Sequence, residues 1–84
     1  MMYQAIVTKY HGPTNYKGSR ISARADAGRI FRSYDHALNA DENHAQAALD
    51  LMEQKGWMRP GRKLRAGALP GHAGYVFVMV DGEA

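Results

Sequence analysis

The sequence predicts a single α+β domain, in which an antiparallel sheet of four to five strands packs one face on a single helix. Short runs that alternate apolar and polar residues recur along the chain, and such runs are typical of half-buried strands. One window in the middle of the chain has helical periodicity and capping residues at both ends. The 84 residues suffice for one modest core, so we assign residues 1–84 to one domain with the order β-β-β-α-β-β.

The first two expected strands span residues 3–10 and 19–25. Both alternate apolar with polar side chains, and the first also contains β-branched residues. In the second strand the alternation places Arg20 and Arg24 on the face opposite the apolar residues. This strand therefore presents a basic face.

Residues 29–34 are expected to form the return strand of a hairpin. Ile30 and Phe31 point to opposite sides, so the sequence leaves the buried face of this strand open. The same uncertainty decides whether Arg29 or Arg32 joins the basic face of the preceding strand.

The helix is expected over residues 40–55. Asn39 followed by Glu42 forms a capping-box pattern, and Gly56 suits the position after the last turn. A helical projection gives an apolar side made of Ala45, Ala48, Leu49, Leu51 and Met52. It gives a solvent side made of Glu42, Asn43, Gln46, Asp50, Glu53 and Gln54.

A weak strand over residues 63–69 and an apolar, central strand over residues 75–80 complete the sheet. Turns around Pro60-Gly61 and over residues 70–74 precede them. The expected core consists of Val7 or Ile6, Ile21, Ala48, Leu49, Met52, Val76 and Val78.

The connection between the first two strands, "HGPTNYKG", is longer than a hairpin needs. Its proline and glycines favour an exposed loop of defined shape, which would place Tyr16, Lys17 and Arg20 at one end of the sheet. We expect this loop to contact a partner.

The charge is distributed unevenly. The formal net charge is +3 and the pI is about 9.5, yet most acidic residues fall between residues 35 and 53, where Lys and Arg are absent. If that window is one helix, the protein has an acidic side and a basic side. The residues expected to bind a partner are Tyr16, Lys17, Arg20, Arg24, Arg32, Glu42, Asp50, Glu53, Arg59 and Arg62.

Several classes of chemistry lack support. The absence of cysteine excludes disulfides, thiolate catalysis and cysteine-type zinc sites. The four histidines follow no metal-ligand spacing, and His44 projects to the edge of the apolar helix side, where one hydrogen bond would satisfy it. No G-x-S-x-G or Walker motif occurs. We expect a non-enzymatic protein without cofactor or metal.

The same composition bears on location and assembly. No apolar stretch approaches ~18 residues, and the N-terminal segment has no signal-peptide pattern, so we expect no membrane contact and a cytoplasmic location. A homodimer would enlarge so small a core, and the sequence leaves this open.

Three stretches resemble small open reading frames carried by phages and mobile elements of bacteria. They are "YQAIVTKYHGPTNYKGSRISA", "NHAQAALDLMEQKGW" and "GYVFVMV", and they cover about half of the chain. Small cysteine-free proteins of this kind include anti-CRISPR and other anti-defence proteins. The resemblance implies an inhibitor that binds a host defence complex, such as a type I CRISPR effector, and blocks its engagement of DNA. It transfers no residue roles.

The residues themselves leave other functions open. Basic and aromatic residues together suit nucleic-acid binding, and they equally suit protein interfaces. The alternative is therefore a nucleic-acid-binding accessory protein that uses the basic sheet face. A structural phage component is a third hypothesis.

Overall fold

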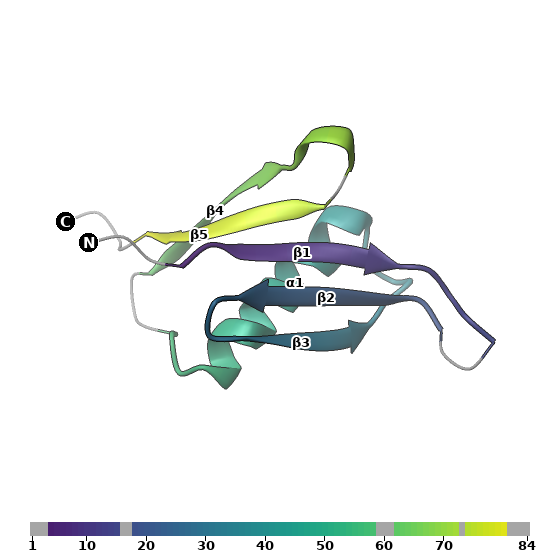
Figure 1. Cartoon of the computed structure of the whole chain (residues 1–84), viewed down its shortest axis with the longest axis horizontal. Helices are drawn as coiled ribbons and strands as arrows, with labels where there is room; N and C mark the ends of the chain where they lie inside the picture. Colours follow the sequence, from purple (N-terminus) through teal and green to yellow (C-terminus); the bar gives the residue numbers. More distant parts are fainter. Residues whose placement is uncertain (1–3, 16–17, 59–61, 73, 81–84) are drawn as a thin grey trace.

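Five antiparallel strands form one sheet, and a single helix lies across one of its faces (Figure 1). The computed structural model describes residues 4–15, 18–58, 62–72 and 74–80. Across the sheet the strands follow the order β3-β2-β1-β5-β4. The elements are β1 (Ile6–His11), β2 (Arg20–Ala25), β3 (Gly28–Ser33), α1 (Ala40–Gln54), β4 (Lys63–Ala68), the 3-10 turn η1 (Pro70–His72) and β5 (Tyr75–Val80). The predicted α+β class and element order are confirmed.

The hydrophobic core lies between α1 and the sheet face that the helix covers, which we call the covered face. Its buried apolar residues are Ile6, Ile21, Ala23, Ala47, Ala48, Leu51, Met52, Phe77 and Met79. Three of the expected core residues, Ile21, Ala48 and Met52, are among them, and Ile6 rather than Val7 is buried. Within the described residues, no helix is both long and apolar enough to cross a membrane.

The prediction of Val76 and Val78 as core residues is wrong. The register pairs Ile6 with Phe77 and Val7 with Val76, so Phe77 faces the helix while the two valines face away from it. Residues 75–80 are all apolar, and the alternation that would identify the buried face is missing from this strand. Leu49, also expected in the core, is only partly buried.

The helix begins and ends as its sequence predicts. The Asn39 side chain accepts a hydrogen bond from the Glu42 N–H at 2.8 Å, and the Glu42 side chain accepts one from the Asn39 N–H at 3.0 Å. At the other end, Gly56 has a φ of 73° and the Trp57 N–H donates to the Met52 carbonyl at 2.8 Å. This is a Schellman ending, and it returns Trp57 to the edge of the core.

Asn43 corrects the predicted solvent side of the helix, because its side chain is fully buried. Its amide oxygen accepts a hydrogen bond from the Asp35 N–H at 2.8 Å. Its amide nitrogen lies 2.9 Å from the Asp35 carbonyl and 3.0 Å from the Asn39 carbonyl. Asn43 therefore holds the turn between β3 and α1, a role that a helical projection does not reveal.

The register of β3 decides the face that the sequence left open. Ala23 lies opposite Ile30, and Ser22 lies opposite Phe31. Ile30 therefore packs toward the core, and Phe31 stands on the other side of the sheet with 46% of its surface exposed.

Gly74 sets the close approach of β5 to β1. Its φ is 136°, and a Cβ at this position would overlap the backbone carbonyl of Thr8. A side chain here would push the start of β5 away from the centre of the sheet.

Candidate functional site

The face of the sheet opposite α1, which we call the open face, carries every second residue of the five strands. Directly paired residues share a face, so the register identifies them. The members are Val7, Lys9, His11, Arg20, Ser22, Arg24, Arg29, Phe31, Ser33, Lys63, Arg65, Gly67, Val76, Val78 and Val80. Each strand except β5 contributes Lys or Arg to this face, and no member is acidic.

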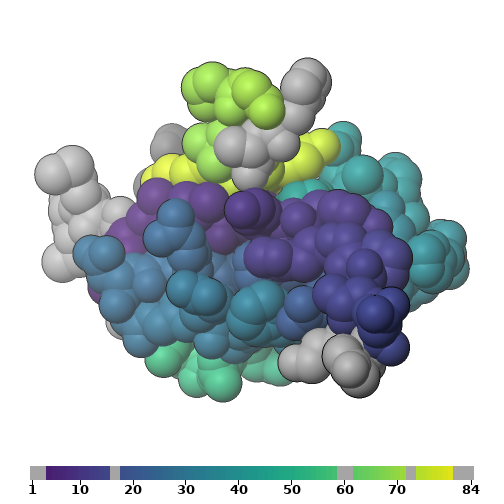
Figure 2. Space-filling view, turned by 45° about the vertical axis from the view of Figure 1, so that its right-hand side comes forward, coloured from purple at the N-terminus to yellow at the C-terminus, as the bar shows by residue number. Residues whose placement is uncertain are grey.

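A hollow of about 350 Å³ lies on the open face over β1 and β2. It is lined by Val7, Lys9, His11, Ser22, Arg24, Arg29 and Leu69. Figure 2 shows this side of the molecule, where the segment containing the end of β4 and η1 (lime) stands above β1 (purple). Leu69 comes from that segment, so the hollow has a wall on its β4 side.

The cations around the hollow form no ion pair with a carboxylate of the described residues. Arg24 pairs directly with Arg29, which starts the two side chains about 5 Å apart. Among the described residues, no carboxylate lies within 4 Å of Lys9, Arg24 or Arg29. Like charges held this close repel one another, and a bound anion would relieve the repulsion.

Phe31 forms an exposed aromatic patch beside the hollow. The Arg20 guanidinium carbon lies 5.0 Å from the centre of its ring, and that of Arg29 lies 6.0 Å away. The His11 ring centre lies 5.4 Å from it, tilted by 53°. The Arg20 Nε is buried and has no hydrogen-bond partner among the described residues. The patch thus combines the face of an aromatic ring with a hydrogen-bond donor, the Arg20 Nε, that has no partner among the described residues.

The pKa of His11 reflects the positive charges around it on the open face. Its Nε2 lies 2.9 Å from the Ser22 hydroxyl. Desolvation lowers the pKa of His11 from its ordinary 6.5, and the positive charges of Arg20, Lys9 and Arg29 lower it further. The field at the hollow is therefore positive and favours anions.

The structure brings together some of the predicted site residues and separates others. Arg20 and Arg24 lie on the open face as expected, and Arg29 joins them. Arg32 lies on the covered face instead, where it forms an ion pair with Asp50 at 2.6 Å. Arg32 is therefore not part of the same surface.

The predicted acidic residues all belong to α1, on the other side of the sheet. Glu42 is engaged in the capping box. Asp50 pairs with Arg32 and also accepts a hydrogen bond from Gln46 at 3.2 Å. Glu53 is exposed. The sheet thus separates the acidic residues of the helix from the basic open face.

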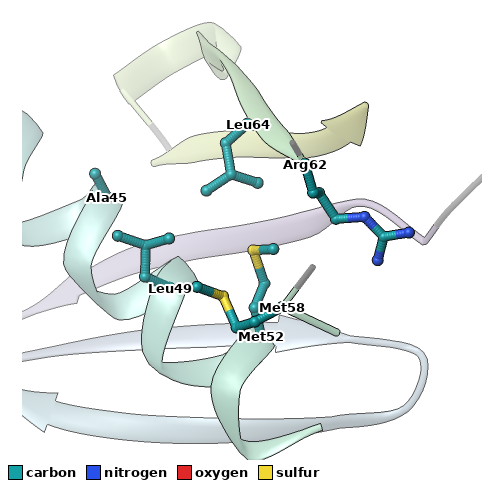
Figure 3. A pocket seen from close by; sticks show the side chains of 6 residues that line it. All are labelled: Ala45, Leu49, Met52, Met58, Arg62 and Leu64. Carbon is teal, nitrogen blue, oxygen red and sulfur yellow. The ribbon is translucent and has the colours of Figure 1, made fainter. Parts of the chain in front are cut away.

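Of the remaining predicted residues, only Arg62 belongs to the described part of the chain. Tyr16, Lys17 and Arg59 lie outside the described residues. Arg62 donates to the Trp57 carbonyl at 2.8 Å. Its side chain lines an apolar groove of about 290 Å³ between α1 and β4, drawn in Figure 3, with Ala45, Leu49, Met52, Met58 and Leu64.

A buried polar cluster joins α1 to the covered face. His44 Nδ1 lies 2.7 Å from the Thr8 hydroxyl, which bears out the expectation of one hydrogen bond. The His44 ring packs on Tyr75, and the Tyr75 hydroxyl donates to Asp41. Thr8 is fully buried and His44 is 5% exposed, so this cluster is part of the packing between the helix and the sheet. No group of three or more potential metal ligands occurs in the described part of the chain.

The sequence analysis did not include Lys9, His11 and Phe31 among the candidate site residues, and it left open whether Arg29 or Arg32 joins the basic face. The alternation of β1 already placed Lys9 and His11 on one side, but only the pairing with β2 shows that this side is the basic one. No family model matches this chain, and no curated protein or solved structure is significantly similar to it. The functional interpretation therefore depends on the geometry of the open face.

Proposed function

We propose that this protein is a non-enzymatic nucleic-acid-binding protein that holds a phosphate backbone on the open face of its sheet. The observation that carries this proposal is the hollow lined by Lys9, Arg24 and Arg29, with no described carboxylate within 4 Å of these cations. Phosphate contacts by Lys and Arg supply most of the affinity of nucleic-acid-binding proteins. The exposed Phe31 adds the aromatic surface that such proteins use for bases.

The test is fluorescence anisotropy with labelled oligonucleotides over a range of salt concentrations. The variant Arg24→Gln/Arg29→Gln removes two cations from the open face. It should weaken binding and reduce the log-log salt slope by about 1.4 to 1.8, because each lost phosphate contact contributes about 0.7 to 0.9.

A matched control removes the same charge from the other side of the molecule. Arg32→Gln/Lys55→Gln alters a covered-face arginine and the residue that ends α1. This control should keep the wild-type slope, and losing one partly exposed ion pair should cost at most about 1 kcal/mol of stability. Equal weakening by both variants would show that net charge alone governs binding, and the open face would lose its role.

Inhibition of a bacterial defence complex stays a prediction. The acidic surface expected for it is reduced in the structure, because Glu42 and Asp50 already have partners within the protein. This favours the open face as the binding surface. A pull-down from host lysate, followed by a DNA-binding assay of the captured complex, tests the inhibitor hypothesis. Loss of capture by Glu53→Lys, with capture kept by Arg24→Gln/Arg29→Gln, would favour it over the proposal above.

A further inference from the structure

We infer that the open face takes single-stranded rather than double-stranded nucleic acid, with an unpaired base stacked on Phe31 and a neighbouring phosphate in the hollow. This inference rests on the proposed function and specifies its ligand. It applies to single-stranded DNA and RNA alike, since both present unpaired bases and the same phosphates.

The first argument is the surroundings of Phe31. The ring is 46% exposed in the middle of a strand, and its near neighbours on the open face are Arg20, Arg29 and His11. Unpaired bases stack on aromatic rings, on imidazoles and on the planes of guanidinium groups. All three kinds of surface meet here, so a base can replace the water that now covers an apolar ring.

The second argument is the position of the hollow relative to the ring. Phe31 pairs directly with Ser22, and Ser22 pairs directly with Lys9. The ring and the hollow therefore lie one to two strand spacings apart, about 5 to 10 Å. Arg29 contributes to both, because it lines the hollow and approaches the ring. A base and an adjacent phosphate of one chain can occupy the two places together.

The third argument is that the sheet is too wide to enter the major groove of a duplex. Five strands at about 4.8 Å spacing give a sheet whose outer strands lie about 19 Å apart. The major groove of B-DNA is about 12 Å wide and admits a helix or a two-stranded ribbon. A duplex would offer this face only its phosphates, and its paired bases would be out of reach of Phe31.

The test compares four probes of equal length by anisotropy: a 15-nucleotide oligothymidylate, a 15-nucleotide oligouridylate, a 15-base-pair DNA duplex and an abasic deoxyribose-phosphate strand. The variants are Phe31→Leu, which keeps an apolar side chain, and Phe31→Trp, which keeps a ring. Circular dichroism and thermal melting establish that each variant is folded, as expected for a position on the open face.

Both base-containing single strands should bind more tightly than the duplex and the abasic strand. Phe31→Leu should weaken their binding by about fivefold or more without changing the salt slope, and Phe31→Trp should retain it. Comparing the affinities for oligothymidylate and oligouridylate shows whether the protein prefers single-stranded DNA or single-stranded RNA.

The failures of the inference and of the proposed function are distinguishable. If all four probes bind equally and Phe31→Leu has no effect, the single-strand inference is overturned while nucleic-acid binding stands. If none of the probes binds, the proposed function fails and the inference fails with it.

Discussion

The covered and open faces of the sheet differ in how their polar groups are satisfied. On the covered side, Thr8 pairs with His44 at 2.7 Å, and Asn43 bonds to the backbone of the turn before α1. On the open side, Arg24 and Arg29 lie next to each other with no described carboxylate within 4 Å. Thr8 and Asn43 are thus satisfied within the protein, whereas Arg24 and Arg29 have no carboxylate partner among the described residues.

Arg29 and Arg32 show the difference within a single strand. Both belong to β3, but they point to opposite faces. Arg32 meets Asp50 of α1 at 2.6 Å and helps to fasten the helix, while Arg29 lines the hollow. The same residue type thus serves structure on one face and is available for binding on the other, and only the direction of the side chain decides which.

The largest expected effect comes from truncating Leu51, a core residue of α1 that packs toward the covered face. This residue is fully buried, so Leu51→Ala should lower the free energy of unfolding by about 2–5 kcal/mol through lost burial and the cavity left behind. Urea denaturation followed by circular dichroism measures this. Leu49→Ala is the control, because Leu49 is partly buried and borders the groove in Figure 3. A loss at Leu49 as large as that at Leu51 would contradict the distinction.

A smaller effect is expected from a methyl group at Gly74. Its positive φ and the overlap with the Thr8 carbonyl predict that Gly74→Ala lowers the free energy of unfolding by about 1–3 kcal/mol. Gly67→Ala places the same methyl group in open space on the open face, and it should be neutral or stabilising by up to about 1 kcal/mol. Equal effects of the two variants in thermal melts would show that β5 tolerates displacement from β1.

The fold could be predicted because its strongest signals are local. The Asn39–Glu42 capping box, the Gly56 ending and the alternation of β2 each depend on neighbours in sequence, and the structure contains all three. The wrong predictions of burial concern residues for which the neighbouring sequence carries no information about the buried face. Val76 and Val78 belong to an entirely apolar strand, and Asn43 is buried by a turn that no helical projection includes.

The open face could be predicted only in part. Arg20 and Arg24 were visible because they alternate within one strand. Lys9, Arg29 and Phe31 join them only through the pairing of β1, β2 and β3, which is a property of register and not of any single strand. The choice between Arg29 and Arg32 stayed open for the same reason, since one residue of slip exchanges the two faces.

The pH dependence of stability should report on His44, the histidine of α1 that packs against the covered face. Burial lowers the pKa of His44 below 6.5, although Asp41 opposes this. In the unfolded chain His44 regains a pKa near 6.5. Below that pH the unfolded state takes up a proton that the folded state does not, so the free energy of unfolding falls as the pH drops through the folded pKa. Urea denaturation at pH 7.5 and 5.5 should show this fall, and His44→Gln should reduce it. An unchanged fall in that variant would assign the effect to other groups.

The smallest expected effect is a pH dependence of binding that involves His11 rather than His44. In the free protein the pKa of His11 is lowered by desolvation and by Arg20, Lys9 and Arg29. A phosphate in the hollow would raise this pKa, so binding would take up a proton and affinity should increase as the pH falls from 7.5 to 5.5. Anisotropy with the 15-nucleotide oligothymidylate at constant salt measures this. His11→Gln should remove the dependence, and His44→Gln, in α1 on the other side of the sheet, should keep it. A wild-type affinity that stays constant over this range would place the phosphate outside the hollow and leave only the contact with Phe31.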